Sequence, residues 1–448
     1  MRPLEFKRCV WPSILHNKMA ETNDVVLACL LFFYLLHMRS RRSRRRLNDL
    51  NADQMQSLTD LALEFDAFRT AERGNMHLLW IVLGHINASV RPIHRTVWTR
   101  ERSDYWWRTI VMRSWNSRDW IENFRMTKDT FMYICTRLRR RIQRVDTRMR
   151  RAVSVELRVG ITLWRLSTNC DYRTIGHLFG IARSTACEIV HETCQQIIAV
   201  FLKSVIRFPT GNELERVVDG FQQRWGFPQV AGAIDATHIP ILAPENYPND
   251  YFNRKSFHSV LVQAVVDDKY CFTDVCVGWP GSVHDARVYS NSRLYQLLSE
   301  NRLLPNRTRQ ISGVDIPIML IGDPAYPLQK HLMKAYSDTG RLTEEEVYYN
   351  RRLSRARMVV ENAFGRLKGR WRSLMKRNDC QLEGIPTIVT TCCILHNLCE
   401  REGNPFYEQW LDNNNVFDVP NVPVDDRDEG FPAQVRRALV QYCQDNRL

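Results

Sequence analysis

The sequence predicts an α/β domain preceded by an α-helical region. Apolar residues recur at helical spacing through Trp106–Phe201, a periodicity of about 3.6 residues that indicates packed helices. After Pro228 the pattern changes to short β-branched runs, and a long helical pattern then covers about Glu344–Leu398. Helices followed by several strands and further helices are typical of a helical module joined to an α/β domain.

Each β-branched run has the length and composition of a buried strand. The predicted strands are Val230–Ile241, Val260–Val266, Phe272–Val277 and Ile316–Ile321. We therefore expect four regions: an unassigned basic and helical segment at 1–105, a helical region at 106–225, an α/β domain at 226–405 and a C-terminal tail at 406–448.

Charge is distributed unevenly along the 448 residues. The net charge is +14, and residues 1–150 contain 28 Lys/Arg against 15 Asp/Glu, so the rest of the chain is close to neutral. A basic first third joined to a balanced remainder indicates a module that binds a polyanion. Nucleic acid is the leading polyanion, and an anionic membrane surface is the alternative. The 13 cysteines lack a framework spacing, which indicates free thiols in a reducing compartment.

One apolar run, Val25–Met38, raises the question of a membrane segment. Its 14 residues fall short of the about 20 that a spanning helix needs, and its basic cluster follows the run instead of preceding it as in a secretory signal. A helix packed on protein is favoured, with a partner-binding helix and a membrane element as alternatives. The cluster indicates either a nuclear localisation signal or a solvated charge run; its residues are Arg39, Arg41, Arg42, Arg44, Arg45 and Arg46.

A helix-turn-helix is predicted near the middle of the helical region. Its first helix is Tyr172–Phe179, its turn is Gly180–Ala182 and its second helix is Arg183–Val200. Thr185 and Glu188 have the spacing of a capping box at the start of the second helix. The alternative is two ordinary packed helices joined by a glycine turn.

In a DNA-binding motif of this kind, the N-terminal residues of the second helix face the bases in the major groove. Arg183 and Ser184 would occupy that position, and Arg173 would contact a phosphate.

Two aspartates stand in apolar, strand-like surroundings. Asp235 lies in AGAIDATHIP and Asp323 in MLIGDPAYP. A carboxylate is costly to bury unless it binds a cation or another partner, and acids at strand ends of an α/β domain lie where ligands bind. Each aspartate by itself could also be an isolated structural residue.

Glu361 is the sole acidic residue between Arg351 and Arg377, a stretch that holds ten Lys/Arg. Its apolar neighbours in MVVENAF point it towards the protein interior, whereas the surrounding cations could reach phosphates. These cations are Arg355, Arg357, Arg366, Lys368, Arg370 and Arg372. A lone helix carboxylate that balances the arginines is the alternative.

Together, Asp235, Asp323 and Glu361 suit a metal-dependent phosphodiester site. Mg²⁺ prefers carboxylate oxygens, water and substrate phosphate, and two ions about 4 Å apart can activate a water or 3′-hydroxyl and stabilise the leaving oxygen. Asp285, in WPGSVHDAR just past the third strand, is a candidate fourth ligand.

Two other chemistries are less well supported. The apolar setting of CCILHNLC favours core packing over zinc for Cys392, Cys393, His396 and Cys399. The sequence has no glycine-rich loop ending in Gly-Lys-Ser/Thr, so ATP hydrolysis is not expected.

Eight segments, in order, resemble the PIF/Harbinger transposase superfamily, which includes the Harbinger transposase-derived nuclease and ALP1-like proteins. They are WIENFRMTKDTFMYICTRLR, Asp171–Glu192, AGAIDATHIPI, NRKSFHSVLVQAVVD, GWPGSVHDARVYSNS, LIGDPAYPL, RARMVVENAFGRLKGRW and LHN. Each is weakly specific, but the ordered set is very specific. It covers about residues 115–400, or two-thirds of the chain.

The resemblance implies a ribonuclease-H-like DDE nuclease domain with Asp235, Asp323 and Glu361 as the catalytic acids that bind Mg²⁺ or Mn²⁺. Asp285 stands where the family also has an acidic residue. Contacts to DNA are expected from Arg173, Arg183, Ser184, Arg254, Lys255, Arg366, Lys368 and Arg370.

The same resemblance implies action on DNA, at transposon terminal repeats if the chain is active. It also implies a Myb/SANT-like partner protein, a homo-oligomer, and a location in the nucleus with the cytoplasm as a second site. Two functions stay open: a metal-dependent endonuclease that cuts and joins strands, and a domesticated DNA-binding or chromatin regulator without catalysis. A membrane-anchored protein is a third class, which rests on Val25–Met38 alone.

Overall fold

The computed structural model describes residues 101–148, 151–337, 340–411 and 430–447. All of these lie in one compact unit, Arg100–Leu448. The apolar run Val25–Met38 and the arginine cluster after it lie outside the described residues, so their predicted roles stay predictions.

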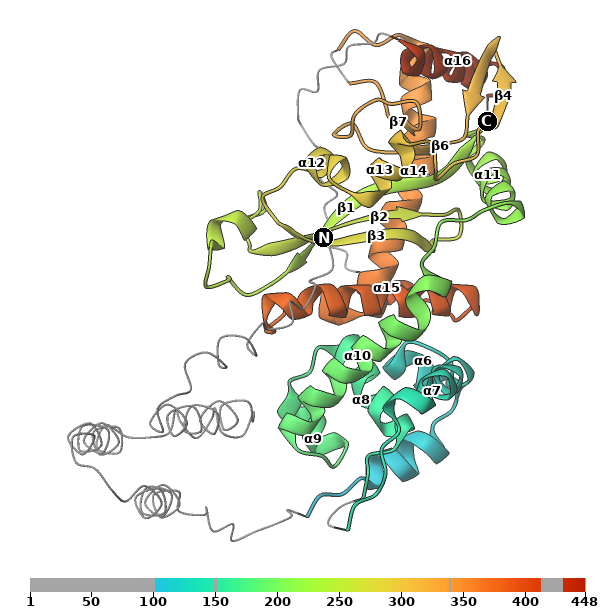
Figure 1. The fold of residues 1–448 in the computed structure, drawn as a ribbon. Coiled ribbons are helices and arrows are strands. Elements are labelled where there is room, and N and C mark those ends of the chain that lie inside the picture. The colour runs from blue at the N-terminus through green and yellow to red at the C-terminus, as the bar shows by residue number, and fades with distance from the viewer. Residues whose placement is uncertain (1–100, 149–150, 338–339, 412–429, 448) are drawn as a thin grey trace, which may run out of the picture. The chain divides into compact units, whose positions relative to one another are not determined.

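The first part of this unit is helical, as the sequence predicts (Figure 1). Its elements are η1 (Trp106–Ser114, a π-helix), α6 (Ser117–Phe124), α7 (Lys128–Ile142), α8 (Val155–Thr168), α9 (Tyr172–Leu178), α10 (Arg183–Val205) and α11 (Asn212–Trp225). Buried aromatic rings fill the space between them. Trp107 meets Phe124 edge to face with ring centroids 6.1 Å apart, and Trp120 lies 5.0 Å from Phe131, distances at which aromatic pairs attract one another.

Two helices, α9 and α10, joined by a short turn, lie where the sequence predicts the helix-turn-helix. Gly180 adopts φ +66° there, a left-handed conformation that glycine takes without strain. A Cβ at Gly180 would lie 2.6 Å from the Ser103 carbonyl oxygen, so the turn also packs closely against the preceding chain. DNA binding by this pair stays a prediction.

The capping box predicted at Thr185 and Glu188 is wrong. Helix α10 begins three residues earlier than that box requires, with Ala182 as its N-cap and no side-chain cap. The Ala182 carbonyl already accepts a hydrogen bond from Ala186 N at 2.8 Å, so Thr185 lies inside the first turn and cannot end it. A capping aspartate stands at α9 instead, where Asp171 accepts hydrogen bonds from two backbone N–H groups of the first turn.

A mixed five-stranded sheet forms the second part, in the order β3-β2-β1-β6-β7. Strands β1, β2 and β3 pair antiparallel, whereas β6 and β7 run parallel to β1. This sheet, with helices on both faces, fits the ribonuclease-H-like domain that the sequence resemblance implies (Figure 1). The strands are β1 (Val230–Pro240), β2 (Ser259–Val266), β3 (Phe272–Pro280), β6 (Met319–Ile321) and β7 (Leu332–Met333).

The fourth predicted strand, Ile316–Ile321, is two strands in different sheets. Strand β5 (Val314–Pro317) pairs with β4 (Thr308–Ile311) in a separate hairpin, and β6 alone joins the main sheet. Pro317 has no backbone N–H and cannot continue a ladder as a donor, which explains why the apolar run changes sheet at this point.

Helices cover the two faces of the main sheet. Helices α14 (Glu344–Arg370) and α15 (Ile385–Arg401) bury residues such as Val360 and Phe364 in the larger core. Helices α11, α12 (Asp285–Ser290) and α13 (Arg293–Ser299) form the smaller core on the other face, with Leu214 and Leu298. In Figure 1, α15 lies between the helical part and the sheet, and it contacts both α10 and β3.

The long helical pattern predicted to about Leu398 is interrupted. Helix α14 ends at Arg370, where Trp371 turns into the core, and the 3-10 helices η3 (Arg372–Leu374) and η4 (Leu382–Gly384) precede α15. The segment Leu382–Arg401 is apolar and long enough to cross a membrane by composition, but in this structure it packs between α10 and β3.

The predicted C-terminal tail contains a packed helix, α16 (Phe431–Asp445), that contacts α14. Arg436 on this helix is buried, and its guanidinium carbon lies 3.8 Å from the centre of the Tyr336 ring. The remaining short elements are the 3-10 helices η2 (Pro248–Tyr251) and η5 (Glu408–Trp410).

The Leu-His-Asn motif on α15 ties the sheet to the helical part. Asn397 is fully buried; its Oδ1 accepts from Phe272 N at 2.8 Å, and its Nδ2 donates to Phe272 O at 2.7 Å and to Val205 O at 3.1 Å. Its neighbour His396 places Nε2 2.9 Å from Tyr270 O. The Asn397 amide therefore forms with Phe272 the two hydrogen bonds that a neighbouring strand would form. It also donates to the carbonyl of Val205, the last residue of α10.

Substituting Asn397→Ala is expected to lower the free energy of unfolding by about 2–4 kcal/mol, because two buried backbone groups of Phe272 lose their partner and each costs ~1–3 kcal/mol. Urea unfolding followed by circular dichroism measures the loss. The control is Asn362→Ala on the exposed side of α14, which should change stability by no more than about 0.5 kcal/mol. Equal effects of the two changes would contradict the assigned role of Asn397.

Candidate metal centre

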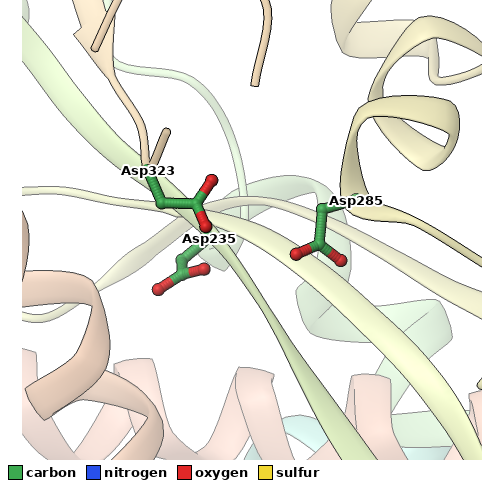
Figure 2. A group of neighbouring side chains, drawn as sticks. All are labelled: Asp235, Asp285 and Asp323. Atoms are coloured by element: carbon green, nitrogen blue, oxygen red, sulfur yellow. The ribbon is translucent and has the colours of Figure 1, made fainter. Parts of the chain in front are cut away.

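Three aspartates from separate elements converge beside the central strand of the sheet (Figure 2). Asp235 lies in the middle of β1, Asp323 lies two residues after β6, and Asp285 begins α12. One carboxylate oxygen of each residue lies within 4.8 Å of the other two. Among the described residues, this is the group of acidic, histidine and cysteine side chains that could hold a metal ion.

The strand register explains why Asp235 and Asp323 meet. Strands β1 and β6 run parallel with Ala233 opposite Ile321. Each aspartate lies two residues beyond its member of that pair, so both side chains leave the sheet at the same level and on the same side.

Asp285 is positioned through its own backbone. Gln263, in the middle of β2, donates from Nε2 to Asp285 O at 3.2 Å and to the Tyr326 hydroxyl at 3.0 Å. Because Gln263 and Tyr326 are both buried, these bonds fix the start of α12 against the sheet beside Asp323.

Glu361 does not belong to this group of aspartates. It lies on α14 and forms an ion pair with Arg357, one turn earlier on the same helix. The Arg357 guanidinium also pairs with Asp235, with Nη1 2.9 Å from Oδ2. All three side chains are mostly buried, with 14–19% of their surface exposed.

The predicted acids are therefore brought together, but in an arrangement that differs from the predicted triad. The structure groups Asp285 directly with Asp235 and Asp323, and it connects Glu361 to them through Arg357. We predicted that Arg357 could contact phosphate and missed its contact with the acids. The spacing of four between Arg357 and Glu361, which allows an ion pair on one helix face, was a usable signal.

Burial dominates the electrostatics of the group. It raises the pKa of Asp235 to about 8; Arg357 opposes this shift, and Asp323 and Asp285 add to it. Burial and the nearby Asp323 raise the pKa of Asp285 to about 7. The pKa of Asp323 is also raised by burial, against the effect of Arg357 and two backbone hydrogen bonds. Such shifts occur when several carboxylates share a buried site without enough positive charge.

The donor set fits a hard divalent cation. It consists of carboxylate oxygens, which Mg²⁺ and Mn²⁺ prefer, and their raised pKa values show that the site favours added positive charge. Asp235 and Asp323 are oriented by hydrogen bonds from Ala236 N and Ala325 N at 2.8 and 3.1 Å.

The structure places the predicted DNA contacts in two kinds of environment. Five of them are exposed, namely Arg173, Arg183, Ser184, Arg254 and Lys255. Lys368 is partly buried beside the site, where its Nζ donates to Thr237 Oγ1 at 2.7 Å and to His238 O at 3.0 Å. Burial and the nearby Lys255 lower the pKa of Lys368 to about 8.

The prediction that Arg370 contacts DNA is wrong for this fold. Its side chain is fully buried, and it donates to Arg125 O at 2.7 Å and to Glu400 at 3.0 Å. Arg366 also pairs with Glu400, with Nη2 2.6 Å from Oε2, and is a quarter exposed. Glu400 therefore pairs with Arg366 and Arg370, two of the cations that we predicted to contact phosphate.

The Cys392, Cys393, His396 and Cys399 group packs in the core, as the sequence favoured. All four side chains are buried. Burial lowers the pKa of His396 to about 4, and its Nε2 meets a backbone carbonyl.

Comparisons with known proteins match the part of the chain that contains the four acids. Residues 234–397 match the family model of the DDE superfamily endonucleases, and residues 106–199 match a domain of unknown function. The Arabidopsis thaliana protein Antagonist of like heterochromatin protein 1 is 29% identical over 312 residues, which cover 65% of this chain and 77% of that protein.

Two further relatives have similar identity to this chain. The Arabidopsis thaliana protein ALP1-like is 28% identical over 65% of this chain and 74% of its own length. Human HARBI1, whose name describes it as a candidate nuclease, is 27% identical over 57% of this chain and 70% of its own length. No solved structure matches the chain.

The stability of the metal-free protein should fall as pH rises from about 4 to 8. Asp235 and Asp285 have folded-state pKa values of about 8 and about 7, above the ordinary 3.8. Each therefore takes up a proton on folding, and its stabilising contribution is complete below pH ~4 and lost as pH passes the folded-state pKa. Because Mg²⁺ competes with those protons, it should raise the melting temperature more at pH 8 than at pH 5.5.

Thermal melts with EDTA or with Mg²⁺ at the two pH values measure this difference. The double variant Asp235→Asn with Asp285→Asn should show little Mg²⁺ effect at either pH. A wild-type shift of the same size at pH 5.5 and pH 8 would contradict the assigned titration.

Proposed function

Because the chain belongs to the Harbinger transposase-derived nuclease family, we propose that it is a divalent-metal-dependent nuclease that cuts DNA phosphodiester bonds. The observation that carries this proposal is the convergence of Asp235, Asp285 and Asp323 on one buried site, with Glu361 connected to them by Arg357. Mg²⁺ or Mn²⁺ is the proposed cofactor.

Asp235, Asp285 and Asp323 would hold the divalent ions, which would activate a water or 3′-hydroxyl and stabilise the leaving oxygen, in the proposed case by a two-metal mechanism. The protein's contribution is to orient the carboxylates and to limit water around them. Asp235 and Asp323 are held by backbone hydrogen bonds, and Asp285 is held by Gln263.

Cations close to the acids support a phosphate substrate. Lys368 lies beside β1 just past Asp235. Arg254 contacts the His284 ring, with Nη2 2.7 Å from Nδ1, and His284 directly precedes Asp285. We propose that Lys368, Arg254 and Lys255 contact the DNA backbone near the scissile bond.

DNA is the proposed partner of the helical part as well. Arg183 and Ser184 are exposed at the start of α10, which suits base contacts, and Arg173 is exposed on α9. A second basic surface is the α7 arginine face, formed by Arg137, Arg140 and Arg141. These three side chains are exposed, follow one helix face and make no ion pair with the described residues. Their neighbours Arg139 and Arg144, in contrast, pair with glutamates.

The further parts of the proposal rest on the family. They are cleavage at transposon terminal repeats with strand joining, a Myb/SANT-like partner, a homo-oligomer, and a nuclear location with the cytoplasm as a second site. The alternative is a domesticated chromatin regulator without catalysis. The name of one Arabidopsis thaliana relative, Antagonist of like heterochromatin protein 1, is the observation that favours it.

Cleavage separates these functions. With Mg²⁺ and a DNA duplex that carries candidate terminal repeats, the wild-type chain with its partner should cut, and Asp323→Asn should cut more slowly by more than about 100-fold. This loss exceeds the 10–100-fold typical of residues that only orient metal ligands. The control is Asp219→Asn on the exposed side of α11, which should leave the rate unchanged. A wild-type protein that binds this DNA with its partner and never cuts it supports the regulator.

Salt dependence tests the α7 arginine face. Each protein–phosphate contact contributes about 0.9 to the slope of log binding constant against log salt for B-DNA. Replacing Arg137, Arg140 and Arg141 by Gln should therefore reduce that slope by about 2–3. The matched control replaces three exposed arginines elsewhere, Arg309, Arg341 and Arg437, and removes the same charge. Equal slopes for the two triple variants would show that only net charge matters.

A further inference from the structure

Arg357 is the one cation bonded directly to the acids of the site within the part of the chain that the structure describes. One of its nitrogens lies 2.9 Å from Asp235 Oδ2, and another pairs with Glu361 Oε1. The guanidinium thus joins an acid of the aspartate group to the acid that stands outside it.

The packing of α14 fixes Arg357 in this position. Ala356, Val359 and Val360 are buried against the sheet, so α14 cannot rotate without exposing them. Arg357 itself is 19% exposed. Burial opposes its charge, but Asp235, Glu361 and Asp323 together raise its pKa, so it stays protonated at any ordinary pH.

The balance of charge limits how many ions this arrangement accepts. The site holds four carboxylates, on Asp235, Asp285, Asp323 and Glu361. One divalent ion together with Arg357 leaves a single negative charge. A second divalent ion would make the site positive while Arg357 stays, and Arg357 already occupies the oxygens of Asp235 and Glu361 that this ion would need. Like charges in a buried site repel strongly.

We propose that Arg357 is an internal counter-ion that occupies the place of a second metal ion. In the absence of DNA, the chain binds one divalent ion at Asp235, Asp285 and Asp323, and Glu361 becomes a ligand only when Arg357 leaves it. This inference rests on the proposed metal dependence and adds a control of ion number to it. In this position, Arg357 keeps the free protein from assembling a complete two-ion site in the absence of its substrate.

Metal stoichiometry tests the proposal without any measurement of activity. Mn²⁺ is titrated into the metal-free full-length protein at pH 7.5 without DNA, followed by calorimetry and by the loss of the free-ion electron paramagnetic resonance signal. Wild type should bind one ion. Arg357→Gln should bind two, and its first ion should bind about tenfold more tightly or better, since a neighbouring opposite charge shifts a carboxylate equilibrium by about 1–3 log units.

Three further variants assign the second ion. Arg355→Gln, the same change on the exposed side of α14, should bind one ion with wild-type affinity. Arg357→Gln combined with Glu361→Gln should return to one ion. Glu361→Gln alone should also bind one ion, with an affinity lowered by about tenfold at most through the loss of one nearby negative charge, because Glu361 is not a ligand while it is paired with Arg357; this result stands even if Arg357→Gln does not fold.

The outcomes are distinct. Two ions in wild type, one ion in a folded Arg357→Gln, or a large loss of affinity in Glu361→Gln alone would each overturn the counter-ion role while leaving metal dependence intact. Binding of no Mn²⁺ by wild type, with no difference from Asp323→Asn, would instead remove the metal dependence on which the inference stands.

Discussion

The need for positive charge among buried carboxylates governs this site and much of the structure around it. Three aspartates place oxygens within 4.8 Å of one another, and burial raises the pKa of two of them to about 7 and about 8. Carboxylates cannot remain ionised together in such a place unless cations accompany them. Arg357 supplies one positive charge, and the remaining negative charge favours a divalent cation at this site.

Helix α14 connects this requirement to the fold. One side of the helix buries Val359, Val360 and Phe364 in the main core, and Arg357 and Glu361 on the same helix reach the site. Because the helix packs in the core, these two side chains have little freedom to move. Asn397 also restricts the fold, because it joins α10, α15 and the start of β3 through a single buried amide and so holds the helical part against the sheet.

In the basic stretch on and after α14, tertiary contacts decide which groups the arginines bind. Arg352 is buried and donates to backbone carbonyls, including Asn446 O at 2.6 Å. Arg370 pairs with Glu400 and donates to a backbone carbonyl, and Arg357 pairs with Asp235 and Glu361. A row of arginines in a sequence suggests a surface for phosphate, but in this fold several of them satisfy groups inside the protein. The α7 arginine face and the arginines Arg173 and Arg183 of α9 and α10, in contrast, are exposed.

The sequence alone determined that helices precede the strands, because apolar periodicity marks helices and β-branched runs mark buried strands. It also identified the candidate acids Asp235, Asp285, Asp323 and Glu361, from their apolar or basic surroundings and from the family resemblance. The tertiary structure decided how the acids combine. Asp285 joins the cluster because Gln263 anchors α12 from another strand, and Glu361 stands apart because Arg357 also reaches Asp235, 122 positions away in the chain. It also decided where the last apolar runs divide, between β5 and β6 and between α14 and α15. Side chains brought together from distant positions settled these points, and periodicity within one segment carries no information about such partners.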